Sequence, residues 1–181
     1  MTTPAPTGPA TLANSFLGET VQVCIVTRDY RRTMEGMVRL GIGPWRVYTF
    51  DSDTNLTETQ IRGVPQPLAM KLCLGFVGGT MWEIVQPLRG PTIYEDFLER
   101  HGEGIHHVAF ACGDMPWQER VREFERRGFP CIQSGIWMKR VPWAYFGTEE
   151  ATGTIFEIFD IPADFELPEP EEWYPAPPPR V

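Results

Sequence analysis

Hydrophobic and polar positions alternate in two short stretches of the chain that have nearly the same pattern. Residues 79–85 read GTMWEIV and residues 153–159 read GTIFEIF, so Gly, Thr and Glu recur in register and the other positions are apolar. Alternation with a period of two predicts β-strands, in which successive side chains point to opposite faces of a sheet. Each predicted strand therefore carries one glutamate, Glu83 or Glu157, among apolar residues.

A second pair of strand-like stretches repeats in the same way. Residues 22–29 read QVCIVTRD and residues 107–114 read HVAFACGD. A polar residue that can bind a metal begins each stretch, Gln22 in one and His107 in the other, and an aspartate ends both. The two pairs of repeats indicate a tandem duplication. Each copy contributes one polar residue on its first strand and one carboxylate on its last.

The first copy has the pattern of a βαβββ unit. Strands are predicted at 20–27, 44–50, 70–77 and 80–86. Apolar residues recur at helical spacing over 30–40, and Gly41 ends this predicted helix. Polar residues, a glycine and two prolines fill 51–67, which predicts a long loop or a hairpin excursion.

The second copy repeats this order after a short helix predicted at 92–100. An amphipathic helix is predicted at 117–127, and Gly128 ends it. Strands are predicted at 105–112, 130–133, 143–146 and 152–161, with a loop over 136–141. Beyond Pro162 the chain is rich in proline and acidic residues, which predicts an extended tail.

These elements predict an α+β fold built from two tandem βαβββ modules, residues 19–87 and 104–162. We expect their strands to form one curved, incompletely closed mixed β-barrel around a metal-binding cup. A flexible N-terminal arm at 1–18, a linker with a short helix at 88–103 and a proline-rich tail at 163–181 complete the predicted organisation.

Composition narrows the classes of partner. The formal net charge of −8 disfavours nucleic acid, whose phosphates need a basic surface. No apolar run is long enough to span a bilayer, and the first residues lack the basic and apolar segments of a signal peptide. The four cysteines (Cys24, Cys73, Cys112 and Cys131) occur singly, which is typical of reduced thiols. We therefore expect a cytoplasmic protein that binds neither nucleic acid nor membranes.

The duplicated polar residues form a possible metal site. If the two modules pair about a pseudo-twofold axis, Gln22, Glu83, His107 and Glu157 converge. An imidazole, two carboxylates and an amide oxygen suit a divalent metal, and this set leaves positions open for substrate, as catalytic sites do. Taken singly, each residue is more often an ordinary surface or core residue. A buried hydrogen-bond network without a metal is the alternative for all four together.

Two segments resemble a known group of proteins. GEGIHHVAF at 102–110 and ATGTIFEIFDIP at 151–162 are similar to segments of the vicinal oxygen chelate superfamily. That superfamily includes glyoxalases, methylmalonyl-CoA epimerases, extradiol dioxygenases and bleomycin-resistance proteins, and the resemblance covers roughly residues 20–162. It implies that His107 and Glu157 are metal ligands, together with Gln22 and Glu83 of the first module. This ligand set is similar to that of zinc-type glyoxalases.

The resemblance implies proton transfer beside a carbonyl. One divalent metal, zinc first and nickel, cobalt, manganese or magnesium as alternatives, would stabilise an enolate while Glu157 or Glu83 moves the proton. The expected activity is that of a metal-dependent isomerase, epimerase or lyase, including lactoylglutathione lyase. The expected substrate is a small-molecule enone or α-hydroxyketone. The chain is also similar to a fungal and plant branch of glyoxalase-like proteins, some of which are implicated in isomerising enone toxins.

Aromatic residues are expected to line the cup, because the six tryptophans favour a bulky, apolar metabolite or toxin. The predicted substrate-binding residues are Trp45, Tyr48, Phe50, Trp82, Met138, Trp143 and Phe146. Ordinary core packing is the alternative for about half of them. Two other functions are weighed. The first is a non-catalytic protein that sequesters a drug or toxin. The second is a ring-cleaving dioxygenase, which would need His in place of Gln22. The sequence leaves open the use of glutathione or CoA, and whether the protein is a monomer or a homodimer.

Overall fold

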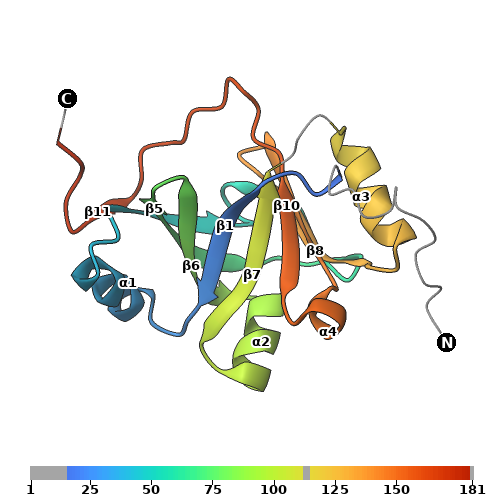
Figure 1. Cartoon of the computed structure of the whole chain (residues 1–181), viewed down its shortest axis with the longest axis horizontal. Helices are drawn as coiled ribbons and strands as arrows, with labels where there is room; N and C mark the ends of the chain where they lie inside the picture. Colours follow the sequence, from blue (N-terminus) through green and yellow to red (C-terminus); the bar gives the residue numbers. More distant parts are fainter. Residues whose placement is uncertain (1–15, 112–114, 180–181) are drawn as a thin grey trace.

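A computed structural model of the chain describes residues 16–111 and 115–179 (Figure 1). The predictions for most of the N-terminal arm, for Cys112 and for Asp114 lie outside these residues. Within them, one curled mixed sheet of eleven strands is flanked by four helices, so the predicted α+β class and curved, open barrel are confirmed. Among the described residues, no helix has both the length and the apolar character to cross a membrane.

The strands follow the chain in short steps. They are β1 (Thr20–Val26), β2 (Trp45–Asp51), β3 (Leu56–Ile61), β4 (Val64–Pro65), β5 (Ala69–Val77), β6 (Thr80–Arg89), β7 (Gly104–Ala111), β8 (Cys131–Trp137), β9 (Val141–Phe146), β10 (Ile155–Phe159) and β11 (Glu172–Tyr174). The helices are α1 (Tyr30–Arg39), α2 (Ile93–His101), α3 (Trp117–Arg126) and α4 (Glu149–Thr152).

The strand order in the sheet reflects the duplication. It runs β11-β2-β5-β6-β1-β7-β10-β9-β8-β3-β4, with β1 and β7 antiparallel at the centre. On one side of this pair β6 lies parallel to β1, and on the other side β10 lies parallel to β7. The two halves thus have the same order outward from the centre, and the four strands that carry the polar residues of the duplication are neighbours (Figure 1).

Local sequence explains where the helices begin. The side chain of Asp29 accepts a hydrogen bond from the Arg32 amide at 2.9 Å and caps the first turn of α1. This is the aspartate that ends the first strand repeat. Thr92 caps α2 in the same way by accepting from the Glu95 amide, and Gly102 ends that helix with φ of 75°.

Several elements depart from the expectations, among them the short helix α4, which precedes β10 and was not predicted. Part of the predicted loop at 51–67 forms β3, which crosses to the other half of the sheet and pairs with β8. The loop predicted at 136–141 is shorter, because β8 and β9 extend to a tight turn in which Met138 and Lys139 have positive φ. The tail, predicted to be extended throughout, contains β11, which pairs with β2.

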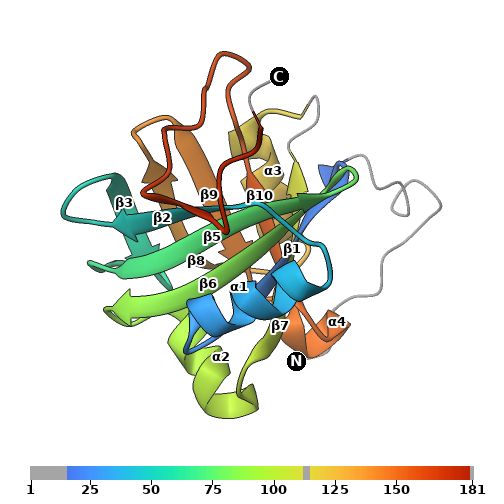
Figure 2. The same ribbon diagram turned by 90° about the vertical axis from the view of Figure 1, so that its left-hand side faces the viewer.

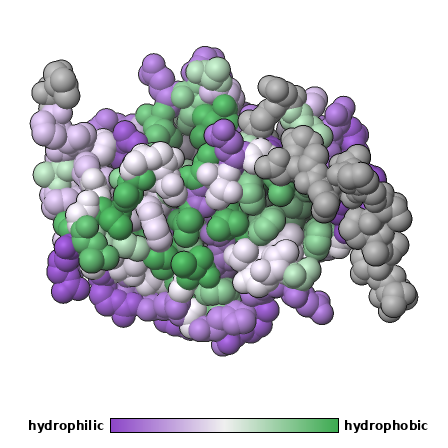
Figure 3. All heavy atoms as spheres, in the orientation of Figure 1, coloured by the Kyte–Doolittle hydropathy of each residue, from purple (hydrophilic) through white to green (hydrophobic). Residues whose placement is uncertain are grey.

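The hydrophobic core has an interior part and two outer parts. The interior part fills the concave side of the curled sheet and includes Leu72, Trp137 and Ile155. One outer part lies between α1 and the sheet, and the other lies between α3 and the sheet. Between these helices, apolar residues also gather on the surface over the central strands (Figure 3). On β7, Ile105 is 58% exposed.

Candidate metal centre and cavity

The structure brings together the four polar residues of the duplication. Gln22 lies on β1, Glu83 on β6, His107 on β7 and Glu157 on β10, and all four are buried, with exposures of 5% or less. The Nε2 atom of His107 lies 3.2 Å from Glu83 Oε2, 3.0 Å from Glu157 Oε2 and 3.4 Å from Gln22 Nε2. Three side chains from three different strands therefore converge on one nitrogen atom.

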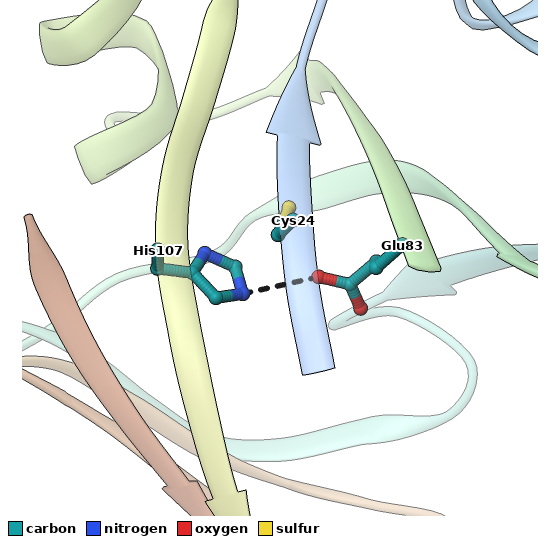
Figure 4. Close-up of side chains that lie close together, drawn as sticks. All are labelled: Cys24, Glu83 and His107. Atoms are coloured by element: carbon teal, nitrogen blue, oxygen red, sulfur yellow. Dashed lines mark ion pairs between the residues drawn. The ribbon is translucent and has the colours of Figure 1, made fainter. Parts of the chain in front are cut away.

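Strand register explains this convergence. Cys24 lies opposite Glu83 on the β6 side of β1 and opposite His107 on the β7 side. In the other half, Glu157 lies opposite Ala109 of β7. Successive side chains of a strand point to opposite faces of the sheet, and residues opposite each other on neighbouring strands share a face. These residues therefore all face the concave side of the sheet. Figure 4 shows the side chains of His107 and Glu83 directed toward each other, with Cys24 on the strand that lies between theirs.

The charges in this cluster affect one another strongly. Burial alone would lower the pKa of His107, but the carboxylates of Glu157 and Glu83 raise it to about 9. Burial raises the pKa of Glu157, and His107 opposes that rise. Burial, reinforced by Glu83, raises the pKa of the Cys24 thiol well above its ordinary value. The cluster is thus a desolvated group of ionisable residues, which is the usual environment of a reactive centre.

The donor atoms fit a divalent cation. Glu83 Oε2 and Glu157 Oε2 are within ion-pair distance of His107 Nε2, yet neither has a partner in hydrogen-bond geometry among the described residues. One imidazole nitrogen carries at most one proton, so it cannot satisfy both carboxylates. A cation bound among these atoms would satisfy both, and nitrogen and oxygen donors of this kind suit zinc and similar metals.

His106 orients the ring of His107. The two Nδ1 atoms are 2.8 Å apart, and His106 is buried against the rings of Tyr94 and Phe97. Burial, reinforced by His107, lowers the pKa of His106 well below its ordinary value and keeps its ring neutral. When His107 donates its Nδ1 proton to His106, the Nε2 lone pair of His107 faces the two carboxylates and is available to a metal.

A cavity of about 300 Å³ lies beside this cluster. Gln22, Glu83 and Glu157 contribute to its wall, and the remaining wall is mostly apolar. The other lining residues include Met70, Leu72, Leu74, Phe76, Trp137, Val141, Tyr145, Phe159, Ile161 and Leu167. The cluster of ionisable residues is therefore reached from an apolar chamber.

Only Phe50 and Trp143 of the predicted substrate-binding residues line this cavity. The other five, Trp45, Tyr48, Trp82, Met138 and Phe146, lie elsewhere. Trp45 and Trp82 pack in the outer core beneath α1, and Phe146 stacks on Phe124 beneath α3. Tyr48 packs in the interior core and Met138 is 44% exposed in the β8–β9 turn. Aromatic residues occur on both faces of these strands, so the sequence does not reveal which of them face the cavity.

Several wall residues were not predicted. Met70, Leu72, Leu74 and Phe76 alternate along β5, and their period of two could have placed them on one face. No sequence pattern of this kind indicated that Tyr145 faces the cavity. Its ring lies 4.9 Å from that of His107, and its hydroxyl accepts a hydrogen bond from Tyr94 at 2.9 Å.

The C-terminal tail covers one side of the cavity. Leu167 reaches the wall, and the neighbouring chain is fixed to β2 and β5 (Figure 2). The Pro168 carbonyl accepts a hydrogen bond from the Tyr48 hydroxyl at 3.0 Å. The Glu171 carboxylate accepts from the Thr49 amide at 2.8 Å and from Lys71 Nζ at 2.7 Å. The tail is therefore part of the chamber.

Several solved structures share the fold of this chain. The solved structure of hypothetical protein BH1468 from Bacillus halodurans C-125 has a TM-score of 0.61 at 17% identity, covering 82% of this chain and 98% of that one. Methylmalonyl-CoA epimerase from Mycobacterium tuberculosis has a TM-score of 0.57 at 17% identity, covering 82% and 91%. A variant of the Streptomyces coelicolor epimerase in complex with 2-nitronate-propionyl-CoA has a TM-score of 0.56 at 16% identity, covering 81% and 99%. At these identities the likeness concerns the fold.

Two sequence comparisons complete the assignment. The uncharacterized protein YqjC of Bacillus subtilis (strain 168) is 28% identical over 93 residues, which span 48% of this chain and 62% of that protein. The family model of the Glyoxalase/Bleomycin resistance protein/Dioxygenase superfamily matches residues 21–143, which include three of the four converging residues. The chain belongs to the Glyoxalase/Bleomycin resistance protein/Dioxygenase superfamily, also called the vicinal oxygen chelate superfamily.

Proposed function

We propose that this chain is a divalent-metal-dependent isomerase or lyase of the glyoxalase type, which moves a proton next to the carbonyl of an apolar substrate. The observation that carries the proposal is the convergence of Glu83, His107 and Glu157 beside the cavity, with two carboxylate oxygens left without hydrogen-bond partners. The epimerases among the structural neighbours support an isomerase, since epimerases are a class of isomerase.

The four converging residues are the proposed ligands. His107 Nε2, the carboxylates of Glu83 and Glu157 and the side-chain oxygen of Gln22 would hold one ion, with zinc as the first choice. When bound, such a cation polarises a substrate carbonyl and stabilises the negative charge that develops on its oxygen. His106 keeps the His107 ring in the orientation that presents Nε2 to the site.

Glu157 is the proposed base. It lines the cavity and lies opposite Tyr145 on the neighbouring strand. Its carboxylate takes a proton from the carbon next to the carbonyl, and the electrons of that C–H bond move toward the carbonyl oxygen. The same group then returns the proton to a different carbon on the same face, or Glu83 delivers a proton to the opposite face, so no redox change occurs. Burial raises the pKa of Glu157 and so strengthens it as a base, although His107 partly offsets this effect.

The cavity favours an apolar carbonyl compound, such as a bulky enone or an α-hydroxyketone. Among the described residues that line it, none is Lys or Arg, so the phosphates of a CoA thioester find no cation there. The apolar wall excludes water from the proton-transfer step and contributes the binding energy of a large hydrophobic ligand. Conversion of such a compound would serve in detoxification.

Sequestration without catalysis is the second candidate function. The observation that favours it is that His107 forms ion pairs with both glutamates, so the cluster holds together without a metal. An apolar cavity would then bind a drug or toxin without changing it. The two functions differ in metal content and in proton exchange.

Elemental analysis of the purified protein, followed by NMR of carbonyl compounds in deuterated water, tests the proposal. We expect about one divalent metal per chain, and deuterium incorporation into a bound enone or hydroxyketone that stops when a chelator is added and returns with zinc. His107→Ala should lose both metal and exchange. The matched control His101→Ala, an exposed histidine on α2, should lose neither. Ligand binding without metal and without exchange would favour sequestration.

A further inference from the structure

Cys24 occupies an unusual place in the cluster of ionisable residues. It is fully buried on β1, two residues after Gln22 and on the same face of that strand. Its register partners are Glu83 on one neighbouring strand and His107 on the other. Figure 4 shows the side chain of Cys24 on β1, to one side of the ion pair between His107 and Glu83. The thiol therefore lies next to two of the proposed metal ligands.

The geometry suits coordination. The sulfur of Cys24, one carboxylate oxygen of Glu83 and one ring nitrogen of His107 all lie within 4.8 Å of one another. Donors of one tetrahedral zinc ion lie roughly 3–4 Å apart, so small side-chain movements would bring these three atoms to one ion. Glu83 Oε2, buried and without a hydrogen-bond partner among the described residues, independently indicates a cationic ligand at this point.

Packing alone does not require a thiol at this position. The duplication makes Ala109 the counterpart of Cys24, because Ala109 follows His107 as Cys24 follows Gln22. Ala109 lies opposite Glu157 just as Cys24 lies opposite Glu83, and both residues are fully buried. A methyl group is thus enough at the equivalent place in the other half of the site.

We propose that the Cys24 thiolate binds the same cation as Glu83 and His107, from the side of the cluster that faces away from the cavity. The inference rests on the proposed metal-dependent function and extends its ligand set. Gln22, Glu83 and Glu157 line the cavity and Cys24 does not, so the thiolate would leave the cavity side of the cation open to substrate. One thiolate and one carboxylate together carry two negative charges, which balance the two positive charges of the cation. The cation then does not need the negative charge of Glu157, so this carboxylate can accept a proton.

A thiolate ligand makes the site selective. Sulfur donors favour zinc, cobalt and other thiophilic metals, whereas magnesium and manganese prefer oxygen donors. We therefore expect the protein to bind zinc and cobalt(II) in preference to magnesium. This prediction narrows the set of metals that the four polar residues alone would accept.

The absorption spectrum of the cobalt(II) protein tests the proposal without any measurement of activity. Cobalt(II) is titrated into the metal-free full chain. We expect binding of about one cobalt per chain, with a thiolate-to-cobalt charge-transfer band in the near ultraviolet. Cys24→Ser and Cys24→Ala should lose the band, and their zinc affinity should fall by roughly 10–100-fold or more, since even outer partners of a ligand have effects of that size.

Cys73→Ser is the matched control. Cys73 is as fully buried as Cys24 but packs on the opposite face of the sheet, in the outer core beneath α1. Its cobalt spectrum should equal that of the wild type. If wild-type protein binds cobalt without the band, or if Cys24→Ser keeps the band, Cys24 is not a ligand and the metal-dependent function stands. Failure of the wild type to bind cobalt or zinc at all would overturn both proposals.

Discussion

The two halves of the site have the same backbone arrangement and different chemistry. Counterpart positions hold Gln22 and His107 on the central strands, and Glu83 and Glu157 on the strands beside them. The next strand outward places Leu74 opposite Glu83 but Tyr145 opposite Glu157. Both carboxylates approach the imidazole of His107, but the outward neighbour of Glu83 is an aliphatic side chain and that of Glu157 is a phenol.

Comparison of the two halves distinguishes the positions of the side chains, which the duplication sets, from their chemistry, which later substitutions set. The repeated β-unit fixes where the side chains converge, because strand register decides which residues share a face. The identity of each side chain then decides charge and reactivity. For the proposed proton transfer, the different surroundings of Glu83 and Glu157 would give the two carboxylates different roles.

The largest expected effect comes from exchanging the two carboxylates for amides, one at a time. Glu157→Gln keeps the shape and one oxygen donor but removes the base, so turnover should fall by roughly 10²–10⁴-fold while metal content falls far less. Glu83→Gln should reduce metal affinity more than it reduces turnover of the loaded enzyme. Steady-state rates, measured together with metal analysis, distinguish the two.

Glu157→Ala is the control for this comparison, since it removes a donor outright and should lose metal as well as activity. If Glu83→Gln abolishes substrate deuterium exchange and Glu157→Gln leaves it unchanged, the base lies in the first half and the assignment of roles is reversed.

The strands that carry the four polar residues could be predicted, because each alternates in a period of two and each has a repeat in the other half. Their convergence followed from the duplication. Most of the cavity wall could not be predicted. β2 is buried on both faces, so Trp45 and Phe50 look alike in the sequence although Trp45 lies beneath α1 and Phe50 faces the cavity.

The pairing of strands that are distant in the sequence also could not be predicted from local sequence patterns. β3 pairs with β8 of the other half, and β11 pairs with β2 across more than a hundred residues of sequence. Neither pairing leaves a turn signal or a periodicity that names the partner strand. Trp137 and Leu167 are wall residues positioned by these connections, which explains why the sequence did not mark them.

A second prediction compares a residue of the outer core with one of the cavity wall. Phe146 is fully buried and stacks on Phe124 with ring centroids 3.9 Å apart, whereas Phe50 stacks on Trp137 beside the cavity. Phe146→Ala should lower the free energy of unfolding by roughly 3–5 kcal/mol and leave the metal content of the folded protein unchanged.

Phe50→Ala is the counterpart on the cavity wall. It should cost less stability, because its ring already borders an open volume, and should weaken the binding of apolar ligands more. Urea unfolding and ligand titration of both variants measure this contrast. An equal loss of ligand affinity in the two variants would mean that the outer core also shapes the cavity.

The smallest expected effect is a pH dependence that belongs to the second half alone. Gln22 does not titrate, but its counterpart His107 has a pKa of about 9, because Glu157 and Glu83 outweigh the opposing effect of burial. Because the pKa of His107 is higher in the folded than in the unfolded protein, its protonation stabilises the folded state. This stabilisation is complete at pH values below the unfolded pKa, near 6.5, and is lost as the pH rises through 9. Glu157 acts in the same direction, since its pKa is raised as well.

Metal-free protein should therefore lose roughly 1–3 kcal/mol of stability between pH 6.5 and 9.5, given about 1.4 kcal/mol for each pKa unit. His106 does not contribute in this window, because its lowered pKa keeps it neutral there. Urea unfolding at both pH values, on chelator-treated wild type and on His107→Gln, isolates the histidine. The variant should lose most of the slope. Zinc-loaded wild type should lose it too, since a metal ligand must be the neutral imidazole. If the metal-free wild type and His107→Gln have equal slopes, the ion pairs of His107 with the two glutamates do not stabilise the fold, and the contrast between the halves lies in reactivity only.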